Sequence, residues 1–132
     1  MVLPLKPKEK RVKFLKNKIA GLLLAAGCSK RFGSDKVLHQ LKGGEYIGIQ
    51  SAKNLKPFVD ELKIVLPQKN SSREELFHAS NFSTVNNKSH QSLIGYSLKT
   101  GLSSIQDSNY CVVALADMPF ISQATYHELI RI

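Results

Sequence analysis

The sequence predicts an α/β fold in which a mostly parallel sheet carries helices on both of its faces. Two predicted strands, residues 19–25 and 110–115, are almost continuously apolar, which is typical of parallel strands covered on both sides. Predicted strands and helices alternate along the chain, as they do in right-handed βαβ units. With 132 residues, 42% of them apolar, the chain is the size of one domain with its own core.

In the first half of the folded part, a strand is followed by a loop and a helix. Apolar residues that recur on one face predict the helix, and Pro57 ends it. The elements expected here are a strand at 19–25, a loop at 26–36, a short extended piece at 37–41, a turn at 42–44 and a helix at 45–57.

The second half repeats the alternation. Ser71 or Ser72 is expected to cap a short helix, and Ser122 is expected to cap the last one, because serine hydroxyls accept hydrogen bonds from a helix's first N–H groups. The elements expected here are a strand at 61–66, a helix through 78, a weak strand at 82–85, a helix at 91–104, a strand at 110–115 and a final helix after 122.

The positive charge of the chain is concentrated at its beginning. The net charge is +9, and residues 1–18 hold seven Lys or Arg and one Glu. This segment is predicted to be a solvated, poorly ordered tail, and residues 19–132 the folded part. A contact of the tail with nucleic acid is the alternative, but Phe14 is its only aromatic residue, which does not favour base stacking.

Cysteine and histidine usage excludes several classes of protein. Cys28 and Cys111 lie far apart, and the four histidines do not show metal-ligand spacing, so neither a zinc site nor a disulfide framework is predicted. Cys28 is interpreted as a small loop residue and Cys111 as a buried strand residue. No stretch is apolar for long enough to span a bilayer, and no secretory signal is recognised, so the cytoplasm is the expected location.

The loop after the first strand has the composition of an anion-binding loop. Gly27 and Gly33 permit backbone conformations that a side chain would forbid. Successive backbone N–H groups in such a loop can surround an anion, and Arg31 and Lys36 add positive charge. The sequence therefore predicts a strand that leads into a polyphosphate-binding loop, whereas Asp35 is interpreted as a solvated loop charge.

A carboxylate follows the strand at 110–115. Ligands of open parallel sheets bind beyond the carboxyl ends of the strands, where both Asp117 and the glycine loop are expected. Mg²⁺ takes one or two carboxylates and completes its shell with waters and phosphate oxygens. The two segments together predict a nucleoside triphosphate site with Mg²⁺ on Asp117. The alternative is that Asp117 only caps the turn before Pro119.

Three blocks of the sequence resemble a known family. The first reads Leu24-Ala25-Ala26-Gly27-x-Ser29-x-Arg31-Phe32-Gly33-x-x-Lys36 and resembles the signature loop of the MobA-like nucleotidyltransferases, with the molybdenum cofactor cytidylyltransferases as the nearest branch. Residues 97–102 resemble the block that lines the nucleotide, with Ser97 and Gly101 in it. Residues 115–120 resemble the metal-binding motif.

The resemblance implies a fold and an activity. The fold is a Rossmann-like three-layer αβα sandwich of the nucleotide-diphospho-sugar transferase type, incomplete at the C-terminus, with residues 19–132 as the N-terminal, nucleotide-binding part of the nucleotidyltransferase domain. The activity is Mg²⁺-dependent transfer of CMP from CTP to a phosphorylated acceptor, molybdopterin in this branch, with release of pyrophosphate. The alanine at position 26 implies CTP, since members with Ala-Gly-Gly in place of Ala-Ala-Gly tend to use GTP.

The resemblance also implies roles for individual residues. Ser97 would sit near the base, although a packing role on its helix is an equal alternative. Asp117 would hold the metal. The base and ribose would contact Leu24, Ala25, Ala26 and Gly27, and the triphosphate would contact Ser29, Arg31 and Lys36, of which Arg31 and Lys36 are the candidate catalytic residues.

The chain departs from the family pattern in two ways. Ser92 stands where a glycine is usual, and bulky Ile94 and Tyr96 stand where small or polar residues are common. Family members also continue beyond the length of this chain, with further strands and a second acidic metal ligand. The alternative function is therefore a truncated nucleotide-binding module without turnover, which is either degenerate or one part of a split protein that a partner chain or a missing C-terminal half completes.

Overall fold

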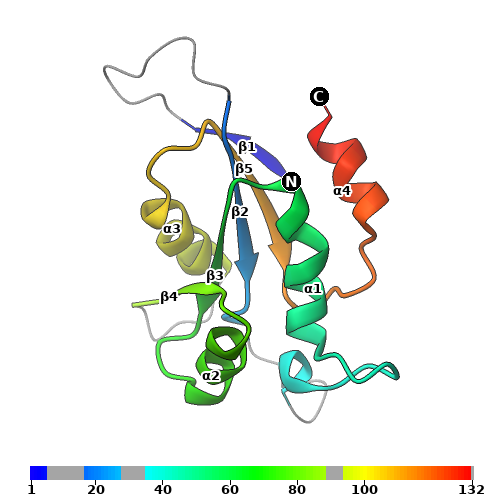
Figure 1. Ribbon diagram of the computed structural model, residues 1–132. Helices are drawn as coiled ribbons and strands as arrows, with labels where there is room; N and C mark the ends of the chain where they lie inside the picture. The colour runs from blue at the N-terminus through cyan, green and yellow to red at the C-terminus, as the bar shows by residue number, and fades with distance from the viewer. Residues whose placement is uncertain (6–16, 28–34, 89–93, 132) are drawn as a thin grey trace.

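The computed structural model describes residues 1–5, 17–27, 35–88 and 94–131. Within these residues a five-stranded sheet forms the centre, in the order β1-β5-β2-β3-β4 (Figure 1). The strands are β1 (Val2–Pro4), β2 (Ile19–Leu24), β3 (Glu61–Leu66), β4 (Ser83–Asn86) and β5 (Tyr110–Leu115). All neighbouring pairs are parallel except β1 with β5. The structure thus confirms the predicted class.

Helices cover both faces of the sheet and make three layers (Figure 1). The side chains of β2 alternate between the two faces: Leu23 packs with α1, α2 and α4, and Leu22 packs with α3. The described helices are the 3-10 turn η2 (Lys36–Leu38), α1 (Ile47–Leu55), the 3-10 turn η3 (Lys56–Phe58), α2 (Ser71–Ala79), α3 (Ile94–Ser104) and α4 (Gln123–Ile130).

Most element boundaries agree with the sequence prediction within three residues. The strands at 61–66 and 110–115 and the Ser122 cap of α4 are confirmed, with the Thr125 N–H donating to the Ser122 hydroxyl over 3.2 Å. Two predictions are wrong. The expected extended piece at 37–41 begins with η2, and the α2 cap is Asn70 rather than Ser71 or Ser72. In both places a side-chain acceptor that the pattern did not reveal takes the helix's first free N–H groups.

The first residues of the chain depart from the predicted tail. Val2–Pro4 form β1, which pairs antiparallel with β5, with Val2 opposite Val112. Val2 packs on one face of the sheet and Leu3 on the other, so two adjacent apolar side chains suit an edge strand. Pro4 ends the strand at the sheet edge, where a proline is tolerated. The prediction for residues 6–16 lies outside the described residues.

The order of the strands places a topological switch point between β2 and β5. From β2 the chain adds β3 and then β4 on one side, and it returns to add β5 on the other side of β2. The two parallel strands stay in register to their ends, where Leu24 lies opposite Leu115. The segments that follow β2 and β5 therefore leave the same edge of the sheet side by side. Ligands of open α/β sheets bind at such a point.

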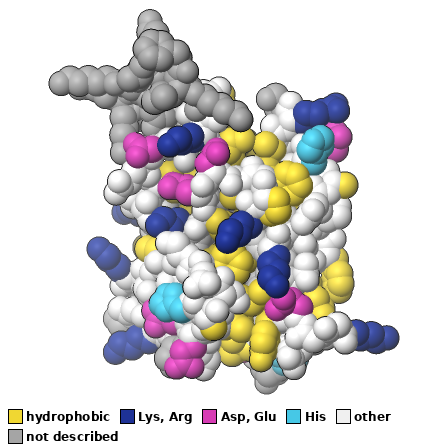
Figure 2. Space-filling model, viewed as in Figure 1, with side chains coloured by type: hydrophobic (Ala, Val, Ile, Leu, Met, Phe, Trp, Pro, Cys, Tyr) yellow, Lys and Arg dark blue, Asp and Glu magenta, His cyan; other side chains and the backbone are white. Residues whose placement is uncertain are grey.

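Charged side chains are mixed on the face shown in Figure 2, where those of Lys and Arg alternate with those of Asp and Glu. On the described residues of this face, basic side chains do not form a continuous patch. In the part of the chain that the structure describes, no helix combines the length and the apolar character needed to cross a membrane.

Candidate functional site

Two predicted site segments meet at the carboxyl edge of β2 and β5. The Ala116 N–H donates to the Leu24 carbonyl over 3.0 Å, and the Ala25 N–H donates to the Val65 carbonyl over 2.8 Å, so the sheet pairing continues just past the strand ends. Asp117 comes next on one segment and is exposed. On the other segment, Gly27 follows the buried Ala25 and Ala26 and is also exposed. The structure thus brings the start of the glycine loop beside the predicted metal ligand.

The apolar residues of the signature loop lie inside the protein. Leu24, Ala25 and Ala26 expose 7%, 2% and 3% of their surface. Ala25 packs with the cluster under α1 and α2, and Ala26 with the cluster under α3. In this structure their side chains shape the floor of the site rather than its open surface. Ser29 and Arg31, both predicted to contact the triphosphate, lie outside the described residues.

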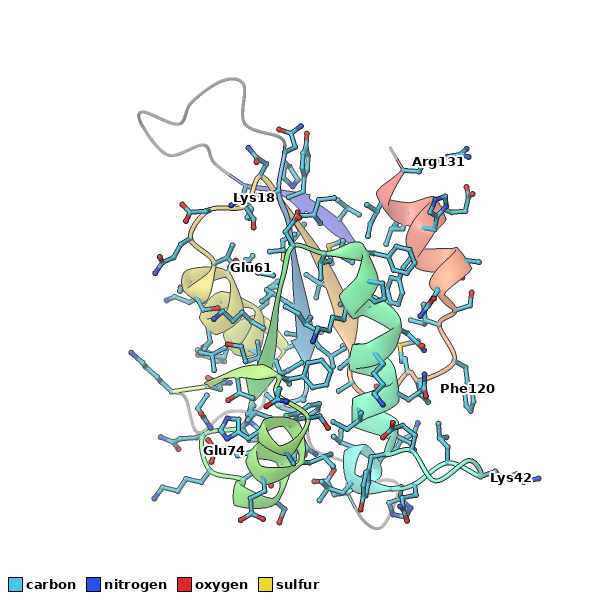
Figure 3. All side chains as sticks on the ribbon, viewed as in Figure 1. Lys18, Lys42, Glu61, Glu74, Phe120 and Arg131 are labelled. Atoms are coloured by element: carbon cyan, nitrogen blue, oxygen red, sulfur yellow. The ribbon has the colours of Figure 1, made fainter. Side chains whose placement is uncertain are left out.

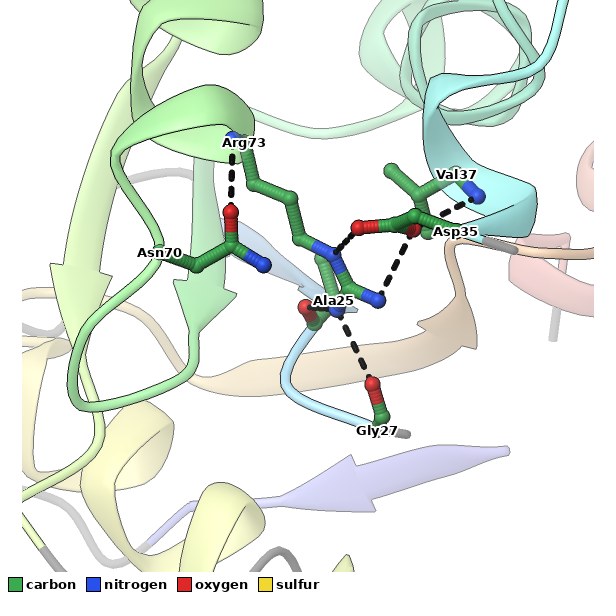
Figure 4. Close-up of polar contacts among 6 residues, drawn as sticks. All are labelled: Ala25, Gly27, Asp35, Val37, Asn70 and Arg73. Carbon is green, nitrogen blue, oxygen red and sulfur yellow. Dashed lines mark hydrogen bonds and ion pairs between the residues drawn. The ribbon is translucent and has the colours of Figure 1, made fainter. Parts of the chain in front are cut away.

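A buried arginine of α2 holds both ends of the loop (Figure 4). Arg73 is 3% exposed, and one of its terminal nitrogens, Nη1, donates to the carbonyl oxygens of Ala25 and Gly27 at the start of the loop. At the end of the loop, Nε lies 2.7 Å from Asp35 Oδ2 and Nη2 lies 2.9 Å from Asp35 Oδ1. Two parallel hydrogen bonds make this a bidentate ion pair, the strongest geometry between these groups.

The ion pair corrects the interpretation of Asp35 as a solvated loop charge. Besides Arg73, Asp35 accepts the Val37 N–H over 3.1 Å and thereby caps η2, of which Lys36 is the first residue. Lys36 itself is half-buried. The charge of Asp35 is matched by Arg73, and none of the ion pairs among the described residues includes Lys36. Within the described residues, the lysine charge stays available for an anion.

The segment that carries Asp117 is fixed from α1. The buried hydroxyl of Ser51 lies 2.9 Å from the Ala116 carbonyl oxygen and 2.9 Å from that of Ile47, which share its single proton. The side-chain amide of Asn54 donates to the Pro119 carbonyl over 2.8 Å. Ala116 and Pro119, which flank Asp117 and Met118, are therefore both anchored to α1. The exposed carboxylate of Asp117 lies between these two anchors.

The donor set at Asp117 fits a metal ion that arrives with phosphate. No group of three or more His, Cys, Asp or Glu side chains gathers among the described residues, so they form no all-protein metal cage. Mg²⁺ is commonly held by one or two carboxylates, with water and substrate phosphate oxygens completing the shell. A single exposed carboxylate at the edge where an anion loop begins matches that requirement. The described residues do not bond to the Asp117 side chain, so they give no support to its alternative role as a turn cap.

Two residues of α3 that the resemblance places in the nucleotide-lining block, Ser97 and Gly101, lie in different surroundings. Ser97 is 3% exposed and accepts from the Asn87 amide over 3.4 Å. An open pocket of about 440 Å³, lined by Asn87 and Tyr96 among others, lies between β4 and α3 beside it. Gly101 instead faces the sheet, where an added Cβ would lie 2.9 Å from side-chain atoms of Leu22. The expectation that this glycine lines the nucleotide is thus corrected to a packing role, and the role of Ser97 stays a prediction.

Cys111 is confirmed as a buried strand residue. Burial raises the pKa of its thiol to about 11, and the nearby carboxylate of Glu61 adds to the rise. A thiol with that pKa carries almost no thiolate at neutral pH, so it does not serve as a nucleophile. Cys28 lies outside the described residues.

Sequence reasoning missed the residues that hold the two site segments, namely Arg73, Ser51 and Asn54. A signal for Arg73 was its place in the first turn of a helix, where a positive charge opposes the helix dipole and needs another reason. The signal for Ser51 was a hydroxyl on the apolar face of the 47–55 helix. Neither signal indicates which residue the side chain would bind, because the hydrogen-bond partners lie 38 to 65 residues away in the chain.

A comparison with protein families matches residues 21–132 to the MobA-like NTP transferase domain. The chain belongs to the MobA-like NTP transferase family. A curated relative, the probable molybdenum cofactor guanylyltransferase of Natranaerobius thermophilus, is 34% identical over 108 residues, which cover 79% of this chain and 49% of that protein. The MobA-like chain thus spans about half the length of the curated relative it matches.

Solved structures share the fold of this MobA-like domain. A nucleotidyl transferase from Methanothermobacter thermautotroptrophicus superposes with a TM-score of 0.78 at 22% identity, over 88% of this chain and 58% of that one. A Mycobacterium tuberculosis protein, Rv0371c, gives a TM-score of 0.74 at 21% identity, over 89% and 61%. The same protein was also solved in complex with manganese, with a TM-score of 0.69 at 20% identity over 89% and 60%. These likenesses confirm the Rossmann-like fold.

Proposed function

We propose that this MobA-like domain binds CTP with Mg²⁺ at the carboxyl edge of β2 and β5, for transfer of CMP to a phosphorylated acceptor such as molybdopterin. The observation that carries the proposal is the meeting of the start of the glycine loop, which Lys36 ends, with the anchored carboxylate of Asp117 at the switch point of the sheet. A cationic, N–H-rich loop beside a single carboxylate suits a triphosphate with its metal.

The proposed reaction does not require a protein nucleophile. An oxygen of the acceptor phosphate attacks the α-phosphorus of CTP in line and forms a new P–O–P bond. The bond between the α-phosphorus and its bridging oxygen to the β-phosphate breaks, and pyrophosphate leaves with the electron pair. Lys36 stabilises charge on the departing phosphates, and Arg31 is proposed to do the same. Asp117 would hold Mg²⁺, which supplies further charge neutralisation when bound.

The preference for CTP is supported by Ala26, which gives the signature loop the Ala-Ala-Gly sequence of the cytidylyltransferases that it resembles. Its methyl group occupies space on the α3 side of the loop, where Ser97 is also found. A methyl group there leaves less room than a glycine would, which favours the smaller pyrimidine. The curated relative is named a guanylyltransferase, so GTP is the competing donor.

A panel of nucleoside triphosphates tests the proposal directly. The melting temperature of the domain is measured with CTP, GTP, ATP and UTP, each with Mg²⁺ and with EDTA, and Kd values follow from calorimetry. A ligand present at a hundredfold excess over its Kd stabilises by about 2.7 kcal/mol. The expected result is the largest stabilisation with CTP and Mg²⁺. A folded domain that none of the four stabilises would overturn the proposal.

Replacing Asp117 by asparagine should remove most of the benefit of the metal. The amide keeps the size of the side chain but lacks the charge that holds Mg²⁺, so Mg²⁺ should improve CTP affinity in the wild type by about tenfold more than in the variant. Asp107→Asn is the control, since Asp107 is an exposed carboxylate just before β5, at the opposite edge of the sheet. Equal metal dependence in wild type and Asp117→Asn would show that the metal ligand lies elsewhere.

Replacing Ala26 by glycine should move the preference from CTP toward GTP. Removal of one methyl group from a hydrophobic pocket changes discrimination by about 1–3 kcal/mol, so the ratio of the two Kd values should shift by roughly tenfold or more. Ala20→Gly provides the control, because that buried methyl group also packs on the α3 side of the sheet but lies at the opposite end of β2. An unchanged ratio in Ala26→Gly would mean that this residue does not select the base.

A module that binds nucleotide without turnover is the second candidate function. One observation that favours it is that the match covers only 49% of the curated relative. The other is that apolar side chains near the predicted metal ligand are exposed, Met118 by 45% and Phe120 by 84%. Figure 3 shows Phe120 on the loop between β5 and α4, pointing away from the sheet. A further segment or a partner chain would bury this surface. Nucleotide binding without pyrophosphate release in the presence of acceptor would identify this case.

A further inference from the structure

We propose that Arg73 is a positioning residue for the triphosphate: it fixes the two ends of the signature loop relative to each other and so sets the place of Lys36. This inference rests on the proposed function. It concerns a residue outside the signature motif, on a different helix, which is not assigned a role by resemblance.

The base of Arg73 is rigid. The N-cap residue of α2, Asn70, accepts the Arg73 main-chain N–H over 3.1 Å, which pins the first turn of the helix at this residue (Figure 4). The side chain is then buried along its length, with 4% of it exposed. A long side chain normally loses much conformational freedom when it is held in this way. Here the guanidinium starts from a fixed point, so its contacts place other groups with respect to α2.

The contacts of the guanidinium join residues on either side of the loop. Its Nη1 reaches the carbonyl oxygens of Ala25 and Gly27, and its Nε and Nη2 reach the carboxylate of Asp35. The planar fork of arginine presents these donors in fixed directions. One side chain therefore sets the separation and the orientation of the points where the loop leaves β2 and where it enters η2.

Asp35 passes this constraint to Lys36. Its Oδ1 accepts from both Arg73 Nη2 and the Val37 N–H, so the ion pair and the cap of η2 share one atom. Lys36 lies between the two residues and begins the 3-10 turn. If the carboxylate moved, the cap and the direction of the first residue of η2 would move with it.

Arg73 is not itself a phosphate ligand in this arrangement. Four hydrogen bonds direct four of its five N–H groups at protein oxygens, and its charge is matched by Asp35. A stability role alone explains the pair poorly, because buried ion pairs can often be replaced by apolar residues without loss. The geometry instead suits preorganisation, in which a second layer of residues holds the ligand-binding group in place.

The test compares Arg73→Lys with wild type. Lysine keeps the charge but offers one ammonium group, which does not span the carboxylate and both carbonyl oxygens. Calorimetry with Mg²⁺ and CTP, and with GTP in parallel, should show affinity lowered by about tenfold in the folded variant. Asp35→Asn is the second variant and should lower it similarly. Lys53→Met is the control, because it removes the exposed Lys53–Glu45 ion pair of 2.6 Å and should leave affinity unchanged.

A double variant separates positioning from general stability. If Arg73 acts through Lys36, then Arg73→Lys should cost little further affinity in a Lys36→Ala background, since coupled residues are not additive. The inference would be overturned if the losses of affinity in the two single variants multiplied in the double variant. It would also be overturned if Arg73→Lys and Asp35→Asn both bound with wild-type affinity, or if both failed to fold. Absence of nucleotide binding by the wild type overturns the proposed function and this inference with it, whereas binding by wild type with unaffected variants overturns only the inference.

Discussion

Lys36→Ala should weaken the binding of CTP with Mg²⁺ by about a hundredfold, because a hydrogen bond to a charged group contributes up to about 3 kcal/mol. The effect should be large for a structural reason. Lys36 begins η2, and its neighbour Asp35 is committed to Arg73, so the ammonium has no competing carboxylate among the described residues. The measurement is calorimetry with CTP and GTP at constant ionic strength, since salt screens charge–phosphate attraction.

The control for this variant is Lys42→Ala. Lys42 is an exposed lysine of the same connecting segment, which the predicted triphosphate site does not include. Both variants lose one positive charge, so a purely long-range effect of net charge would weaken binding equally in the two. Equal losses, or a loss below about threefold in Lys36→Ala, would contradict a direct contact between Lys36 and the phosphates.

The sequence predicts the part of this site that local patterns encode. Continuous apolar runs revealed β2 and β5, since strands buried on both faces have no polar alternation to obscure them. Their ends then located Gly27 and Asp117, which the structure places at one edge of the sheet. The strand β1 escaped prediction because three residues within a basic segment give no measurable period.

The residues that hold the site could not be predicted because they act across the fold. Whether Asp35 is solvated or paired depends on Arg73, which is 38 residues away and which reaches it only after α2 packs on the sheet. The turn η2 likewise forms because Asp35 caps it, against a local pattern that indicated an extended piece. A local pattern thus identified the loop that would contact the ligand, and tertiary contacts identified what fixes that loop.

Gly101→Ala should lower the free energy of unfolding by about 1–3 kcal/mol, as overpacking of a tight core does. An added Cβ would lie 2.9 Å from Leu22 Cδ1 and 2.9 Å from Val65 Cγ2. Both side chains belong to central strands and are fully buried, so they have little room to move. Chemical denaturation measures the change, and the melting temperature should fall by roughly 4 °C for each kcal/mol.

The same helix supplies a matched control. Gly95→Ala would add a Cβ that meets no described atom within 4 Å apart from its chain neighbours and the nearby backbone of its own helix, so it should gain up to about 1 kcal/mol from the better helix propensity of alanine. The two variants are the same chemical change in α3, and they differ in what the methyl group meets. Equal stability of Gly101→Ala and Gly95→Ala would mean that α3 lies farther from β2 than the structure has it.

A second substitution can show that the cost arises at the predicted contact. Val65→Ala removes the Cγ2 atom that the new methyl group would meet, at the cost of a cavity. Because the two positions touch, the double variant should lose less stability than the sum of the single variants, by about 0.5 kcal/mol or more. Simple additivity would place the strain elsewhere in the helix. Non-additivity of that size would confirm that α3 contacts the sheet at this point. It would thereby support the position of Ser97, which lies one turn closer to the carboxyl edge.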